Sequence, residues 1–145
     1  MQSDINKHIT AWVEKLSVRH AELGKFPVCP FAKSAKYEII EVLENTIDPP
    51  QHEFELVIFV LDDKYTNAEL VEIAKENNIT YPYLVFLPDS KNSYSEINGI
   101  QTNNGKYNLL MCQSRASLQI ARDKLATTPY YSFWSKEFLE EILTL

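Results

Sequence analysis

The segment from residue 54 to 87 constrains the fold most, because it reads as a strand, a helix and a second strand. Residues 54–61 are almost continuously apolar and rich in β-branched and aromatic side chains, which is typical of a strand covered on both faces. Thr66 or Asn67 can cap the following helix, and residues 83–87 form the second apolar run. This spacing predicts a βαβ unit whose two strands are parallel.

The elements before this unit are less regular. Apolar residues recur at helical spacing from Ile5 to Leu16, so we expect a helix that Ser3 or Asp4 caps and Gly24 ends. The segment from Lys25 to Val28 is too short for a strand and is interrupted by proline. Residues 37–43 fit either a helix or a β-branched strand. A resemblance given below favours a short helix followed by a strand.

After the central unit, residues 90–105 are polar and rich in Asn and Ser, which predicts a long loop. A last strand is expected over residues 106–112, followed by a helix that Ser114 caps. A terminal helix is expected over residues 131–145, after the break at Thr127-Thr128-Pro129. The 145 residues suit one domain. We therefore predict a single α/β (or α+β) domain with a mixed sheet of about four strands and packed helices.

Composition excludes several classes of function. The net charge of -6 argues against a general nucleic-acid-binding surface, and three glycines in the whole chain provide no Gly-rich phosphate loop. The first residues lack the pattern of a signal peptide, and no apolar run is long enough for a membrane span. We expect a cytoplasmic protein without nucleic-acid or membrane partners, and we predict no cofactor. The oligomeric state stays open.

Cys29 is the leading candidate for chemistry. It stands between Pro27 and Pro30, and Pro30 suits the first position of a helix with Cys29 at its cap. The positive end of the helix dipole and Lys33 one turn later would favour a thiolate there, which is a nucleophile or redox group. The alternative is a small buried apolar residue at a rigid junction. Cys112 reads as part of the core.

Polar residues near strand ends are the second set of candidates. Asp62 and Asp63 follow one buried strand and Asp89 follows the other, and ligands of open α/β sheets gather at such carboxyl ends. Asn103 would line the same pocket. Arg115, at the start of the helix capped by Ser114, can hold an anionic group. The three histidines are scattered and no cysteine has a neighbour at ligand spacing, so we predict no metal site.

Two resemblances extend this interpretation. Cys29-Pro30-Phe31-Ala32 resembles the one-cysteine active-site turn of omega-class glutathione transferases, which have a thioredoxin-like fold. Tyr81-Pro82 before an apolar strand resembles the cis-proline of that fold. The resemblance implies that Cys29 faces Pro82.

The second resemblance covers more of the chain. An uncharacterised bacterial domain family begins with a helix that carries tryptophan, followed by a Leu-Cys-Pro-Phe-Ala-Lys segment and a strand. Trp12, residues 28–33 and residues 37–43 are similar in kind and order, as are Pro88-Asp89 and Asn103-Asn104 later in the chain. This similarity implies a shared layout and no particular activity.

Two functional hypotheses follow. The first is an enzyme or redox protein that uses Cys29 and Lys33 on a small molecule. The second is a non-catalytic interaction or structural module, in which the aromatic segment 130–134 anchors a protein partner and the Cys-Pro-Phe-Ala motif only packs.

Overall fold

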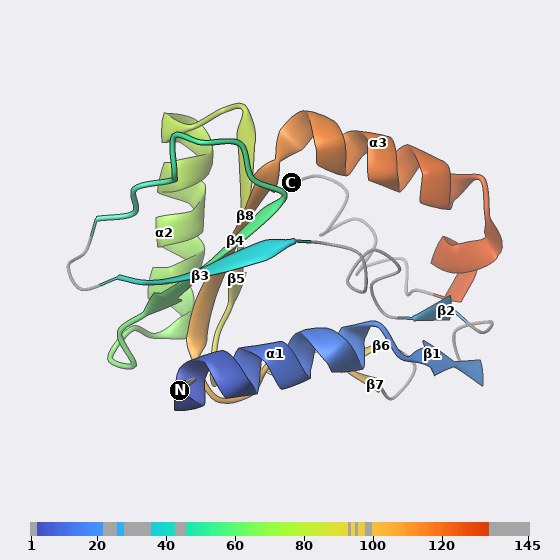
Figure 1. Ribbon diagram of the computed structural model, residues 1–145, viewed down its shortest axis with the longest axis horizontal. Coiled ribbons are helices and arrows are strands. Elements are labelled where there is room, and N and C mark those ends of the chain that lie inside the picture. Colours follow the sequence, from blue (N-terminus) through green and yellow to red (C-terminus); the bar gives the residue numbers. More distant parts are fainter. Residues whose placement is uncertain are drawn as a thin grey trace.

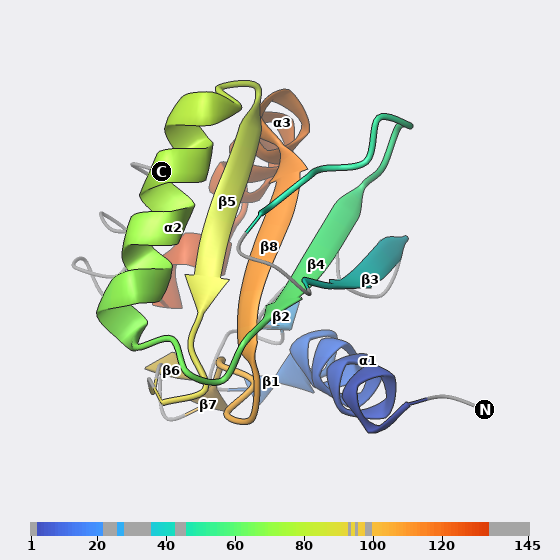
Figure 2. The same cartoon turned by 90° about the vertical axis from the view of Figure 1, so that its left-hand side faces the viewer.

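The centre of the molecule is a four-stranded mixed sheet in the order β3-β4-β8-β5. In this computed structural model the described residues are 3–21, 26–27, 36–42, 46–92, 94, 96–97 and 100–133. The sheet strands are Tyr37–Glu41 (β3), Leu56–Leu61 (β4), Leu84–Asp89 (β5) and Asn108–Ser114 (β8). Figure 2 shows them side by side, with β3 at one edge and β5 at the other. The predicted α/β class and mixed sheet are confirmed.

The strands β4 and β5 run in the same direction, as the strand–helix–strand pattern predicted, but they are not neighbours. The last strand, β8, lies between them and is antiparallel to both. On the other side of β4, β3 pairs in parallel, so residues 37–41 form a strand. The predicted short helix before this strand lies among residues 28–35, outside the described residues.

The described part of the chain contains three α-helices, of which the first two pack on opposite faces of this sheet (Figure 1). They are Asp4–Leu16 (α1), Asn67–Thr80 (α2) and Arg115–Ala126 (α3), and a 3-10 helix, Pro129–Phe133 (η2), follows the last. Their N-caps are the expected Ser3, Thr66 and Ser114, each accepting a bond from a backbone N–H of the first turn. Residues 134–145 of the predicted terminal helix lie outside the described residues.

Side chains alternate between the two faces of the sheet, and each face builds its own core. Phe59, Phe86 and Leu110 pack with Leu70 of α2 on one face. The residues next to these in sequence, Ile58, Val60 and Leu109, point to the other face. There they pack against helix α1, through Ile9, Trp12 and Val13. Because both faces are covered, β4 is nearly continuously apolar, as its sequence indicated.

Several predicted boundaries were wrong. Helix α1 ends at Leu16 and not at Gly24, because the Ser17 hydroxyl and N–H both bind the Glu14 carbonyl and close the last turn. The segment from Lys25 to Val28 was expected to be too short for a strand. It contains the two-residue strand Phe26–Pro27 (β2), which pairs with Arg19–His20 (β1). The loop over residues 90–105 contains the short antiparallel pair Glu96–Ile97 (β6) and Ile100–Gln101 (β7).

Candidate functional site

A hollow lies beside α2, where the helices of the described part of the chain cover only part of this face of the sheet. Four strands place the outer two about 14 Å apart, whereas a helix with its side chains is about 10 Å wide. Helix α2 packs on β5 and β8, and Figure 2 shows it over that half of the sheet. Between α2, Ile47 and the turn after β4 lies a hollow that we call the α2 groove; Leu61 and Ile47 at its base are buried, whereas Val42, Tyr65 and Ile73 are only partly buried.

The α2 groove has a volume of about 500 Å³. Its apolar floor joins the core through Leu61 and Ile47, with Ile73, Tyr65 and Val42 packed against them. The complete lining combines this floor with a charged rim, and it consists of Val42, Ile47, Leu61, Asp62, Lys64, Tyr65, Ala68, Glu69, Glu72, Ile73 and Glu76.

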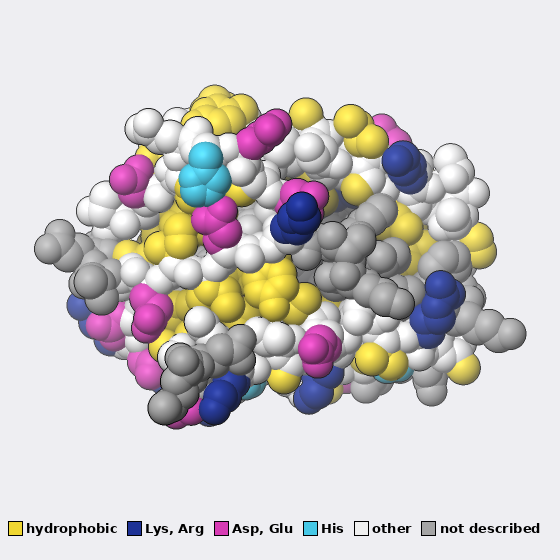
Figure 3. All heavy atoms as spheres, in the orientation of Figure 1, with side chains coloured by type: hydrophobic (Ala, Val, Ile, Leu, Met, Phe, Trp, Pro, Cys, Tyr) yellow, Lys and Arg dark blue, Asp and Glu magenta, His cyan; other side chains and the backbone are white. Residues whose placement is uncertain are grey.

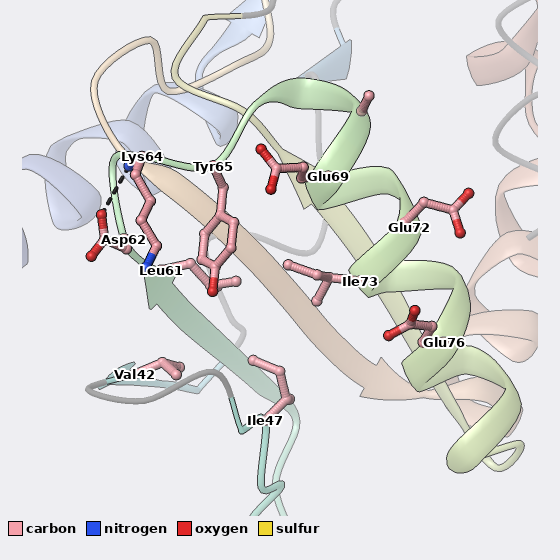
Figure 4. A pocket seen from close by; sticks show the side chains of 11 residues that line it. Val42, Ile47, Leu61, Asp62, Lys64, Tyr65, Glu69, Glu72, Ile73 and Glu76 are labelled. Atoms are coloured by element: carbon pink, nitrogen blue, oxygen red, sulfur yellow. Dashed lines mark hydrogen bonds between the residues drawn. The ribbon is translucent and has the colours of Figure 1, made fainter.

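Helix α2 supplies the acidic wall of the groove. Glu69, Glu72, Ile73 and Glu76 are spaced i, i+3, i+4 and i+7, so they share one flank of the helix. Figure 4 shows Glu69, Ile73 and Glu76 extending from α2 on the side of Tyr65, with Glu72 at the outer rim. Core-facing Leu70 fixes the rotation of the helix, and its burial holds this flank in place.

The N-terminus of α2 is closed by a capping box. The Thr66 hydroxyl accepts a bond from the Glu69 N–H at 3.2 Å, and the Glu69 carboxylate accepts one from the Thr66 N–H at 3.1 Å. Glu72 makes a long, exposed ion pair with Lys75 at 3.6 Å. Exposed pairs of this kind contribute little, so the Glu72 carboxylate remains accessible to a ligand.

The turn after β4 closes one end of the groove. The Asp62 carboxylate accepts a bond from the Lys64 N–H at 2.9 Å, and the Lys64 ammonium lies over the Tyr65 ring. The groove lining therefore carries four carboxylates (Asp62, Glu69, Glu72 and Glu76) against one ammonium, that of Lys64. The sequence placed Asp62 at a ligand site, and in the structure it stands at the mouth of this groove.

Asp89 and Asn103 lie at the same end of the sheet but in a separate, buried network. The Asp89 Oδ2 accepts bonds from the Asn104 N–H at 2.9 Å and from the Asn104 Nδ2 at 2.7 Å. Burial raises the pKa of the Asp89 carboxyl, and the two Asn104 bonds partly oppose that shift. Asn103 is buried next to this pair and lines a small cavity of about 130 Å³ with His8, Trp12 and Lys15 of α1.

Two asparagines to which the sequence analysis assigned no structural role, Asn104 and Asn108, organise these loops. Asn104 Oδ1 accepts bonds from the N–H groups of Lys106 and Tyr107, forming a turn in which Gly105 has a φ of 75°. This turn delays the start of β8 to Asn108, two residues after the predicted position.

Asn108 is fully buried and joins three segments of the chain. Its Nδ2 donates to the carbonyls of Asp62 and Tyr65, and its Oδ1 accepts from the Lys91 N–H. The side-chain polar atoms of Asn104 and Asn108 are thus hydrogen-bonded within the fold. This network holds the turn after β4, which closes the α2 groove, in place and does not itself present a reactive group.

Arg115 lies at the opposite end of the sheet from Asp89. Its guanidinium donates to the carbonyls of Pro82 and Leu84 at 3.0 and 3.2 Å, which joins α3 to the start of β5. In the register of the sheet Leu84 pairs with Ser114, whereas Asp89 pairs with Leu109. The structure therefore does not bring Arg115 together with Asp62, Asp89 and Asn103. The second arginine of this helix, Arg122, is buried, and burial lowers the pKa of its guanidinium.

Cys29 and Lys33 lie outside the described residues, so their predicted chemistry stays a prediction. The other thiol is inert: Cys112 is a free, fully buried cysteine, and burial raises its pKa to about 12. In the described part of the chain no peptide bond is cis, so Pro82 does not show the cis-proline that the thioredoxin resemblance implied. Tyr130 of the aromatic segment is buried and belongs to the core.

No family model, curated protein or solved structure matches this chain. Within the ranges that the structure describes, no helix is long and apolar enough to cross a membrane. Among the same residues, no group of three His, Cys, Asp or Glu side chains is arranged to hold a metal ion.

Proposed function

We propose that this protein is a binding module that receives a segment of another protein in the α2 groove. One observation carries the proposal: a groove of about 500 Å³ lies between α2 and Ile47, and the partly buried Val42, Tyr65 and Ile73 that line it pack directly on the hydrophobic core. Grooves of this volume fall within the range of ligand sites. This is the non-catalytic alternative from the sequence, with the groove in place of the aromatic segment as the anchor.

The rim and floor suit a peptide. Val42, Tyr65 and Ile73, which are partly exposed, provide an apolar surface for anchoring side chains, and the carboxylates around them provide the polar edge typical of a recognition site. Hydrophobic side chains also reach the surface near the middle of the face shown in Figure 3. Apolar surface that remains open to solvent is the usual mark of an interaction site.

Two matched alanines allow a direct test. Ala68 lines the groove and is the second residue of α2, and Ala116 is the second residue of α3; both are exposed. A displayed library of random peptides would be selected on the wild-type protein, and the binders measured on Ala68→Trp and Ala116→Trp. We expect Ala68→Trp, which fills the mouth of the groove, to weaken them at least about tenfold and Ala116→Trp to leave them unchanged.

Circular dichroism and thermal unfolding would verify that both variants are folded. Selection of peptides whose binding is lost only in Ala68→Trp would support the groove as a binding site. The proposal would be overturned if no selected peptide distinguished Ala68→Trp from Ala116→Trp.

A further inference from the structure

We propose, on the basis of the binding function above, that the partner segment is a basic amphipathic helix. The shape of the groove is the first reason. One wall is helix α2, and Val42, Ile47 and Leu61 lie across the groove from it, so a second helix could lie alongside α2 in the same layer. Docking of an amphipathic helix through spaced apolar anchors is a common mode of peptide recognition.

The charge of the rim is the second reason. Glu69, Glu72 and Glu76 span seven residues, or about 10 Å along α2, which is two helical turns. A helix lying beside them would place side chains at i, i+3 or i+4, and i+7 opposite these carboxylates. Lys or Arg at these positions would neutralise the rim, whereas Asp or Glu would be repelled.

The protein's own helices do not match this surface. On α3 the exposed charged side chains are Asp123 and Lys124, which cancel, because Arg115 binds backbone carbonyls and Arg122 is buried. On α1 the exposed charges likewise cancel, with Asp4 and Glu14 against Lys7 and Lys15. A second copy of the described chain therefore offers no basic helix.

The C-terminal sequence is also of the wrong sign. Residues 134–145 contain three glutamates (Glu137, Glu140 and Glu141) and one lysine, Lys136. A helix formed by this sequence would set carboxylates against the acidic wall of α2. Charge complementarity thus argues against the C-terminal sequence and the described helices as the source, and the proposal commits to a basic helix of a different protein.

The probes are three synthetic 18-residue peptides that share one stripe of leucines at helical spacing. Their flanking positions carry Lys in the first, Gln in the second and Glu in the third. Fluorescence anisotropy would give the Kd of each at low salt and at 0.5 M NaCl. We expect the Lys peptide to bind at least about tenfold more tightly than the Gln peptide, the Glu peptide to bind weakest, and the difference to shrink in high salt.

Variants separate the groove from the overall negative charge of the protein. Glu72→Gln combined with Glu76→Gln should weaken the Lys peptide by roughly three- to thirtyfold, since each exposed charge contact is worth a modest factor. Glu14→Gln combined with Glu53→Gln removes the same charge outside the groove lining and should leave the Kd nearly unchanged. Ala68→Trp should abolish binding of the Lys peptide.

Each outcome decides one of the two proposals. If library peptides bind the groove but are not basic, or if the Gln peptide binds as tightly as the Lys peptide, the basic-helix proposal fails and the binding function stands. Equal weakening by the control pair Glu14→Gln and Glu53→Gln would show non-specific attraction and overturn the basic-helix proposal as well. If neither library peptides nor the Lys peptide respond to Ala68→Trp, both proposals fail.

Discussion

Cys112 shows how burial decides the chemistry of a single side chain. It lies on β8, opposite Val57 of β4 and Phe86 of β5, and its thiol is enclosed by the core around α2. Loss of solvent penalises the thiolate, which raises the pKa to about 12. A thiol in this state is neither a nucleophile nor a redox partner near neutral pH.

We therefore expect thiol reagents to leave Cys112 unmodified in the native protein at pH 8. Intact-mass measurement after treatment with iodoacetamide should show at most one label per native chain and two after unfolding in urea. In Cys29→Ser, native labelling should disappear. Rapid native labelling of Cys29→Ser would contradict the burial of Cys112.

The same experiment on the wild-type protein gives the reaction rate of Cys29 alone. A rate near neutral pH well above that of the unfolded chain would support the predicted thiolate at Cys29, because only the deprotonated sulfur reacts. A native rate at or below the unfolded rate would count against catalysis by this residue.

At the scale of elements, the free edge of the sheet is protected by a side chain. Strand β5 lies at the edge, and Asn78 of α2 binds both backbone groups of Phe86, donating to its carbonyl at 3.1 Å and accepting from its N–H at 2.8 Å. The carboxamide thus takes the place of a neighbouring strand. This arrangement satisfies polar groups of a buried residue and blocks pairing with another chain.

Replacing Asn78 by Leu should lower the free energy of unfolding by about 1 to 3 kcal/mol, because two backbone groups lose their partner. Asn77 is the matched control, since its side chain bonds only the Ile73 carbonyl of its own helix at 2.8 Å. Asn77→Leu should cost clearly less, and urea unfolding of both variants would measure the difference. Equal losses for Asn77→Leu and Asn78→Leu would show that the Phe86 bonds contribute little.

Local signals in the sequence predicted the strands and helices of the central unit but not how the strands pair. Apolar runs and capping residues identified β4, α2 and β5, because those signals depend on neighbouring residues only. The insertion of β8 between β4 and β5 depends on contacts between distant residues, which periodicity does not contain. The role of Asn78 could not be predicted for the same reason: it bonds the backbone of Phe86, which is only eight residues away in sequence but lies in another element.

The α2 groove was also missed, although part of its signal is present in the sequence. Glu69, Glu72 and Glu76 share a helix flank with Ile73, an apolar residue within an acidic stripe. Such a stripe usually faces solvent, so the pattern alone does not indicate a ligand site. The groove becomes visible only in the fold, where no helix formed by the described residues covers the sheet beside that flank.

At the scale of the whole molecule, the end of the sheet nearest the groove is held by buried polar groups. Asn108 joins the turn after β4 to Lys91 after β5, and Asn104 joins Asp89 to the loop before β8. His8 and Trp12 extend the network to α1, donating to the carbonyls of Asn104 and Thr102. Loops that are distant in sequence therefore depend on the same hydrogen bonds, and their stability is coupled.

Asp89 should make the stability of this assembly depend on pH. Its folded-state pKa is raised by burial, so the folded protein holds the Asp89 proton more tightly than the unfolded chain does. The resulting stabilisation is fully present below the ordinary pKa of aspartate, about 3.9, and is lost as pH rises through the raised value. Asp89→Asn retains an oxygen acceptor for the two Asn104 donors but does not titrate. We expect the free energy of unfolding of wild type, measured relative to Asp89→Asn, to fall between pH 4 and pH 7.

Urea unfolding at several pH values would measure that difference, with Asp123→Asn as a control for removing one carboxylate from the surface. Asp89→Ala tests the hydrogen bonds themselves: it leaves both Asn104 donors without an acceptor and should be about 1 to 3 kcal/mol less stable than Asp89→Asn at every pH. A wild-type stability that rises from pH 4 to pH 7 relative to Asp89→Asn would mean that the Asn104 bonds outweigh burial. In that case Asp89 would be held ionised in the folded protein, and the loops at this end of the sheet would be fastened by a charged carboxylate.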